Sequence, residues 1–268
     1  MIRDITIGQY YPAKSVLHRL DPRVKLVGTL LYLISLFLFN SIPGYVMTTL
    51  FLILVIRISK VPFSFIVRGL KPVIMLLMIT VLFNLFLTRD GAVLFHAWIF
   101  TITEGGLRTA VYMAIRLIYL IIGSSLMTFT TTPNELTDGI EELLGPLNKI
   151  RVPVHEIAMI MSIALRFIPI LLEETDKIMK AQIARGADFE NGNLIQKAKN
   201  MVPLLVPLFI SAFRRANDLA MAMEARCYHG GDNRTQMKPL CYKKRDHMAY
   251  VILAAYLAVA IGFRAAGI

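Results

Sequence analysis

The stretch PVIMLLMITVLFNLFL, residues 72–87, decides the class of fold, because it carries no charged side chain and is nearly long enough to cross a bilayer. Four further apolar runs occupy residues 24–39, 45–58, 107–129 and 249–262. The 268-residue chain is 56% hydrophobic and only 18% charged, whereas soluble domains are about one quarter charged. In lipid each run must satisfy its own backbone hydrogen bonds. The sequence therefore predicts an all-α, polytopic membrane protein with about five transmembrane helices.

The charge is basic, with 29 Lys+Arg against 18 Asp+Glu and a net charge of +11. In a soluble protein this would suggest nucleic acid, but here the charge follows the membrane topology and no nucleic-acid partner is expected. Lys and Arg gather in residues 1–23 and between the second and third spans, whereas residues 40–44 carry no charge. Because cytoplasmic loops are enriched in Lys and Arg, we predict a multi-pass protein of the plasma membrane with a cytoplasmic N-terminus.

This topology divides the chain into four parts. Residues 1–23 form a cytoplasmic N-terminal segment, residues 24–129 hold transmembrane helices one to four, and residues 249–268 hold the last. Residues 130–248 are then a cytoplasmic domain.

A seven-span alternative would also pass residues 157–172 and 201–213 through the bilayer. We reject it because these stretches are interrupted by prolines, and because the basic segment between them would then lie outside.

Long helices are predicted within the cytoplasmic domain. Thr132-Pro133-Asn134-Glu135 begins a first helix that reaches about Leu144. A second helix begins after Pro153 and runs to about Ala184, and a third runs from about Leu194 to Arg226, bent by Pro203 and Pro207. Their apolar faces require a partner surface or the membrane interface.

The two long helices end in a similar signature. Residues 181–186 read AQIARG and residues 222–227 read AMEARC, so that an arginine stands between small residues in both, 41 positions apart. A guanidinium between small side chains can enter a groove and pair bidentately with a carboxylate. A single copy would fit an ordinary C-terminal arginine, but two copies at matching helix ends indicate docking.

Several motifs together resemble one family, the transmembrane T components of energy-coupling factor (ECF) transporters, which are relatives of ABC transporters. The motifs are the segment LDPRVKL at 20–26, TPNEL at 132–136, IALRFIP at 163–169 followed by Glu173 and Glu174, and the two arginine signatures. The resemblance covers nearly the whole chain. Cys227 departs mildly from the family pattern, where glycine or serine is expected.

The resemblance implies a non-catalytic scaffold of a vitamin or trace-nutrient importer. In this family two long cytoplasmic coupling helices each dock an arginine on one of two ABC-type ATPases, and the scaffold holds a substrate-binding membrane S component. ATP-driven movement of the coupling helices re-orients the S component. Carried over, the ATPase-docking residues are Ala184, Arg185 and Gly186 at one end, and Ala225, Arg226 and Cys227 at the other.

Other functions find less support in the sequence. No Gly-Lys-Ser/Thr phosphate loop occurs, no cofactor is expected, and Cys227, His229, Cys241 and His247 fit no standard metal spacing. A self-contained secondary transporter or channel is the alternative, although no inverted repeat is evident. An intramembrane enzyme would need acidic or histidine residues within the spans, which contain none. Arg116 in the fourth span could be functional or could pair near the outer end.

Overall fold

The computed structural model describes residues 10–87, 92–97, 100–187, 189, 193–230, 237 and 239–265. The regular elements in these residues are helices, apart from one antiparallel pair of strands, which confirms the predicted helical membrane fold. By its internal contacts the chain divides into two compact units. The first comprises residues 8–139 and 240–268, and the described part of the second falls within residues 140–239.

Six α-helices and the strand pair belong to the first unit. They are α1 (Pro22–Ser35), α2 (Ile42–Ser59), α3 (Phe63–Leu70), α4 (Ile74–Leu87), β1 (Val93–Ala97), β2 (Phe100–Thr103), α5 (Glu104–Thr130) and α9 (Lys244–Ala265). Capping residues mark two of the helix starts. The Asp21 side chain accepts from the Arg23 N–H before α1, and the Thr103 hydroxyl accepts from the Gly106 N–H at the start of α5.

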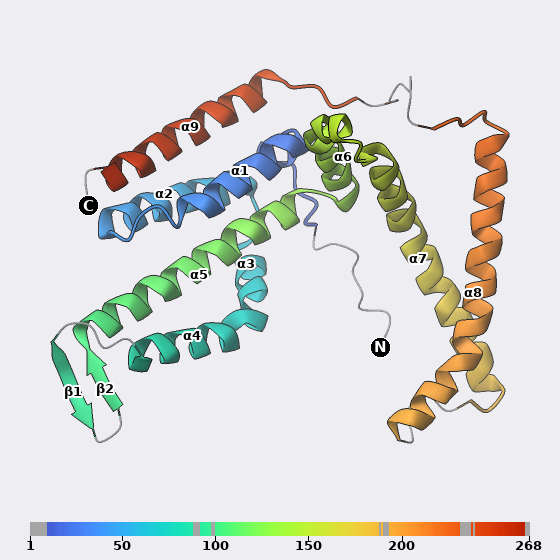
Figure 1. Cartoon of the computed structure of the whole chain (residues 1–268), viewed down its shortest axis with the longest axis horizontal. Coiled ribbons are helices and arrows are strands. Elements are labelled where there is room, and N and C mark those ends of the chain that lie inside the picture. Colours follow the sequence, from blue (N-terminus) through green and yellow to red (C-terminus); the bar gives the residue numbers. More distant parts are fainter. Residues whose placement is uncertain are drawn as a thin grey trace. The chain divides into compact units, whose positions relative to one another are not determined.

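The core of the first unit lies among α1, α2, α5 and α9, which Figure 1 shows side by side. Tyr256 of α9 reaches its centre, where its hydroxyl lies 3.0 Å from Ser35 Oγ and 3.3 Å from Thr48 Oγ1. These polar groups satisfy one another, as buried groups in a bilayer must. Close approach also matters, because a Cβ atom at Gly123 would lie only 2.4 Å from the Tyr32 ring.

Five helical segments in the described residues are long and apolar enough to cross a membrane. They are Ile42–Ser59, Phe63–Phe86, Glu104–Thr130, Val154–Ala184 and Lys244–Ala265. The number agrees with the prediction, and four of the five coincide with predicted spans.

The remaining segment differs from the prediction. In the predicted first span, 24–39, the helix α1 ends at Ser35 and is about 21 Å long, shorter than the roughly 30 Å hydrocarbon layer. Val154–Ala184 qualifies in its place because only Glu156 and Arg166 are charged in its first half, and its other charged residues lie after Leu172. This criterion uses length and composition only, so the side of the membrane on which residues 130–248 lie stays a prediction.

The second unit is built on two long helices, α7 (Val154–Ala184) and α8 (Leu194–Glu224), which cross each other in Figure 1. They follow α6 (Pro133–Leu144), whose chain passes from the first unit into the second, and the 3-10 segment Gly145–Ile150. Thr132 and Glu135 form a capping box at the start of α6, each side chain accepting from the backbone N–H of the other. The three helices predicted here are confirmed to within about two residues at each end.

Candidate functional site

The end of α7 forms a Schellman motif around Arg185. The Gly186 N–H donates to the Ile183 carbonyl at 2.9 Å, and the Ala187 N–H donates to the Gln182 carbonyl at 3.0 Å. Gly186 has φ +88°, the left-handed conformation that this motif requires. Arg185 is therefore the last residue before the backbone turns into the left-handed conformation at Gly186.

The end of α8 repeats this geometry at Arg226. The Cys227 N–H donates to the Glu224 carbonyl at 2.9 Å, and the Tyr228 N–H donates to the Met223 carbonyl at 3.1 Å. Each donor and acceptor stands 41 positions after its counterpart in α7. Cys227 has φ +56° and occupies the place of Gly186. The similarity first seen in sequence is thus a similarity of backbone hydrogen bonding as well.

We call residues 184–187 and 225–228 the two arginine turns. All six predicted docking residues in them are exposed: Ala184, Arg185, Gly186, Ala225, Arg226 and Cys227. Neither arginine forms an ion pair within the part of the chain that the structure describes. Two exposed guanidinium groups are therefore presented at hydrogen-bonded helix ends.

An ion pair joins α7 to α8. Arg215 Nη2 lies 2.6 Å from Glu174 Oε2, and the Ser211 hydroxyl donates to Glu174 Oε1 at 2.8 Å. The Arg215 and Ser211 hydrogen bonds hold the pKa of the Glu174 carboxyl below its usual range. Glu174 lies beyond the apolar half of α7, and Arg215 is its counterpart at the 41-residue spacing. The interhelical ion pair is thus formed between equivalent positions of the repeat.

The two helices run antiparallel at this contact. Gln182, further along α7, donates from Nε2 to the carbonyl of Pro203, which precedes Arg215 in α8. Each arginine follows the ion-paired residue of its own helix by 11 positions, 174 to 185 and 215 to 226, or about 16 Å of helix. The helical segments 174–185 and 215–226, which we call the two arms, therefore have equal length and extend from the crossing in opposite directions.

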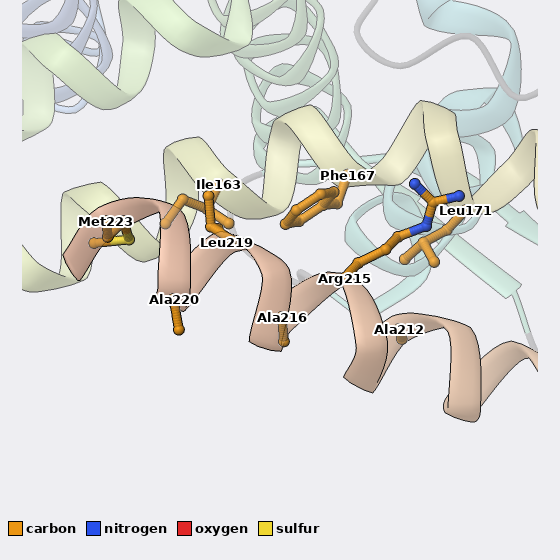
Figure 2. Close-up of a pocket in the computed structure, with 9 residues that line it drawn as sticks. All are labelled: Ile163, Phe167, Leu171, Ala212, Arg215, Ala216, Leu219, Ala220 and Met223. Carbon is orange, nitrogen blue, oxygen red and sulfur yellow. The ribbon is translucent and has the colours of Figure 1, made fainter. Parts of the chain in front are cut away.

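Small side chains on α8 allow the helices to approach. A pocket of about 300 Å³ lies between them. Figure 2 shows Phe167 and Leu171 projecting from α7 toward α8, where Ala212 and Ala216 stand. Sequence analysis missed this contact, although the alanines recur every fourth residue at 212, 216 and 220, which marks one helix face.

Large apolar side chains remain exposed along α8. Five of them, at least half exposed, are Val202, Val206, Phe209, Ile210 and Phe213. Contiguous exposed apolar surface of this kind marks an interaction with another protein or with a membrane.

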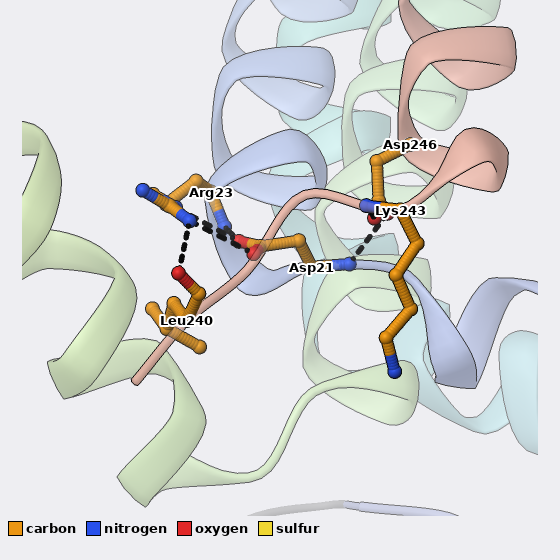
Figure 3. A network of polar contacts seen from close by, with 5 residues as sticks. All are labelled: Asp21, Arg23, Leu240, Lys243 and Asp246. Atoms are coloured by element: carbon orange, nitrogen blue, oxygen red, sulfur yellow. Dashed lines mark hydrogen bonds and ion pairs between the residues drawn. The ribbon is translucent and has the colours of Figure 1, made fainter. Parts of the chain in front are cut away.

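The charged turn before α1 connects two helices of the first unit, as Figure 3 shows. The Arg23 guanidinium donates from Nε to Asp21 at 3.1 Å and from Nη2 to the Leu240 carbonyl at 3.0 Å. The Asp21 N–H and the Lys243 N–H donate to the two carboxylate oxygens of Asp246. The turn therefore fixes the start of α1 against the start of α9.

Arg116 is buried in α5 and contacts the connection between α1 and α2. Its Nη2 donates to the Phe39 carbonyl and the Tyr45 hydroxyl, both at 3.3 Å, and to the Asn40 side chain. Its guanidinium also lies 5.3 Å from the centre of the Phe37 ring. Of the two interpretations that the sequence allowed, these contacts favour local pairing.

The fold and the arginine turns define a class, that of multi-pass helical membrane proteins of the plasma membrane that carry a separate unit of long crossing helices. Residues 13–237 match the family model described as CbiQ, cobalt transport protein.

Relatives from several bacteria carry the name energy-coupling factor transporter transmembrane protein EcfT. The relative from Clostridium kluyveri is 57% identical over 97% of each chain. The one from Bacillus subtilis is 48% identical over 99% of this chain and all of its own, and the one from Lactococcus lactis is 44% identical over 93% and 94%. The chain therefore belongs to this family, the transmembrane T components of ECF transporters.

Proposed function

We propose that this T component is a non-catalytic scaffold that couples ATP hydrolysis by two partner ATPases to re-orientation of a substrate-binding S component. Arg185 docks on one ATPase and Arg226 on the other. A vitamin or trace nutrient is the class of cargo, and the S component selects it.

The observation that carries this proposal is the equivalence of the two arginine turns. Both present an exposed arginine at the end of a Schellman motif, beside a small residue with positive φ. Both lie 11 positions beyond the Glu174–Arg215 pair. A pair of similar sites on two helices suits a partner that is itself a pair of similar domains, as two ABC ATPases are.

The proposal requires α7 and α8 to lie on the cytoplasmic side. The second half of α7 is charged, with Glu173, Glu174 and Lys177 close together. α8 packs antiparallel along it and is not among the helices that qualify as spans. If α7 crossed the bilayer, its partner would have to lie beside it in lipid. If α7 and α8 lie as an amphipathic pair at the cytoplasmic membrane interface, the apolar faces of both helices are covered and their charged faces remain in water.

The exposed apolar surface of α8 supports the second part of the proposal. Its side chains, among them Val206, Phe209 and Phe213, would contact the S component while the arginine turns contact the ATPases. Movement of the ATPases would then reach the S component through rigid helices.

Co-purification in mild detergent tests the docking roles. Wild type should retain ABC ATPases and a small membrane protein. Arg185→Glu and Arg226→Glu should each weaken ATPase retention, by about 2–5 kcal/mol if each arginine forms a buried charge pair, and the double variant should abolish it.

The matched control is Arg214→Glu, an exposed arginine of α8 outside both turns, which should retain the ATPases. If wild type purifies alone, or if the double variant keeps its ATPases, the docking proposal is wrong. The self-contained transporter would then be the function to test.

A further inference from the structure

A second cavity lies wholly within the first unit, among α1, α2, α5 and α9, and has a volume of about 430 Å³. Most of its lining is apolar and includes Leu17, Leu54, Ile58, Met248, Ile252 and Leu253. It extends from Lys25, near the start of α1, to Tyr32 two turns further along. The cavity is thus a slot that runs along the helices from their predicted cytoplasmic ends.

The slot is open toward the surroundings of the helices. Leu54, Met248 and Ile252 line it and are 51%, 62% and 47% exposed. They belong to α2 and α9, both of which qualify as membrane spans. What enters the slot from the side therefore comes from the hydrocarbon layer, because the helices that form it stand in lipid.

The predicted cytoplasmic end of the slot is cationic. Lys25 and Arg245 line it, and no carboxylate does. Lys25 is only 6% exposed, and its Nζ donates to the carbonyls of His18 at 3.2 Å and Thr130 at 2.8 Å. Neither cation has an ion-pair partner within the described residues. A buried ammonium held only by neutral carbonyls is stabilised by a further anionic partner.

Three carboxylates attract Lys25, those of Glu135, Asp21 and Asp246, and each already accepts hydrogen bonds from elsewhere in the chain. Glu135 accepts from the Thr132 N–H. Asp21 accepts from the backbone and the guanidinium of Arg23. Asp246 accepts from two backbone N–H groups, those of Asp21 and Lys243. None of them forms an ion pair with Lys25 or Arg245 within the described residues, so these two cations can accept a further anionic partner from outside the chain.

We propose that this slot binds an anionic phospholipid of the cytoplasmic leaflet, with its phosphate at Lys25 and Arg245 and one acyl chain along the apolar walls. A phospholipid matches both halves of the site, since its phosphate lies at the membrane interface and its chain lies parallel to the helices. The lipid would fill the space beside the α1–α9 contact and hold the starts of both helices together. Lys25, in the segment 20–26, then has a role in lipid binding. This segment takes no part in the proposed ATPase docking.

Native mass spectrometry of the complex tests the proposal. The complex is reconstituted in nanodiscs of equal parts phosphatidylglycerol and phosphatidylcholine. It is then released from the nanodiscs in the mass spectrometer, and the lipids that stay bound are counted. Wild type should retain one phosphatidylglycerol per T component, in at least tenfold preference to phosphatidylcholine. Lys25→Met and Arg245→Gln together should abolish this preference, and Arg245→Gln alone should reduce it.

A second variant separates lipid binding from folding. Gly28 lines the slot, and a Cβ atom there would meet only Leu253 Cδ2, at 3.9 Å. Gly28→Leu should therefore fold, fill the slot and lose both lipids while Lys25 and Arg245 remain. Arg57→Gln, an exposed arginine at the same end of α2 that does not line the slot, is the matched control and should bind as wild type.

Equal retention of the two lipids by wild type would overturn the proposal, and so would undiminished phosphatidylglycerol in Gly28→Leu. A phosphatidylglycerol with a diazirine in its acyl chain identifies the location. Labelling at Leu54, Met248 or Ile252 supports the slot, whereas labelling confined to other helices contradicts it.

Discussion

Glu174 and Arg215 occupy equivalent positions in the two arginine-ended helices, 41 residues apart, and form the ion pair that joins those helices, at 2.6 Å. The repeat thus has a centre as well as two ends. Because the helices are antiparallel there and Arg185 and Arg226 each lie 11 positions beyond, the crossing sets the separation of these two arginines. A change at the crossing should therefore alter both turns together.

Glu174→Gln should loosen the crossing. The pair is partly exposed, so the expected loss is modest, about 0.5–1 kcal/mol. Spin labels at Ala187 and Tyr228 should show a broader distance distribution than in wild type. Exchange of the charges, Glu174→Arg with Arg215→Glu, should narrow it again, and Glu173→Gln, at an exposed neighbour, should leave it unchanged. An unchanged distribution in Glu174→Gln would show that the ion pair does not set the arm separation.

Acidic pH should act on the same contact. Arg215 and Ser211 lower the pKa of Glu174 in the folded state, so the ionised carboxylate contributes stability above the usual carboxyl pKa of about 4.3. That contribution is lost as the pH falls through the lowered folded value. The spin-label distribution should stay narrow near pH 5 and broaden only below about pH 4, and in Glu174→Gln this change should be missing.

Cys227→Gly should stabilise the second arginine turn. Cys227 has φ +56°, which glycine adopts without steric cost, and Gly186 occupies the same place in the first turn. The expected gain is about 1 kcal/mol, measured as slower amide exchange at residues 225–228. ATPase retention should be unchanged. Gly186→Val should do the reverse at the first turn, and faster exchange in Cys227→Gly would contradict the argument.

Arg116→Met should destabilise the first unit. It removes the donor to the Phe39 carbonyl, the Asn40 side chain and the Tyr45 hydroxyl, and unsatisfied buried groups cost about 1–3 kcal/mol. Thermal unfolding in detergent should begin at a lower temperature. Arg108→Gln, an exposed arginine two turns earlier in α5, is the control. If Arg116→Met unfolds as wild type but lowers transport, Arg116 has a functional role after all.

Residue types that stop or start helices made much of the fold predictable. Thr132, Pro153 and Gly186 fixed the ends of α6 and α7 closely, because caps, prolines and positive-φ glycines act locally. The sequence did not predict the strands β1 and β2. They lie in the connection between α4 and α5, which mixes apolar and polar residues and has no strong turn signal between the two strands. α1 was predicted too long, because the apolar run to Phe39 continues past the end of the helix at Ser35.

The candidate site was predictable at its ends but not at its centre. The arginine signatures are visible in the sequence because two similar six-residue segments stand 41 residues apart. The Glu174–Arg215 pair is visible only if the same spacing is carried back into the helices, where the residue types differ. The slot was not predictable, since Lys25 and Arg245 are 220 positions apart and line the same cavity only because α1 packs against α9.

Site-specific photocross-linking from the two arginine turns tests the central claim most directly. A benzophenone amino acid is placed at Ala187 or at Tyr228, the last residue of each turn, and the complex is irradiated in native membranes. We expect both positions to cross-link to ABC ATPase chains, and both adducts to disappear in the Arg185→Glu/Arg226→Glu background. If both positions cross-link only to lipid or to extracellular protein, the ATPase-docking proposal is contradicted.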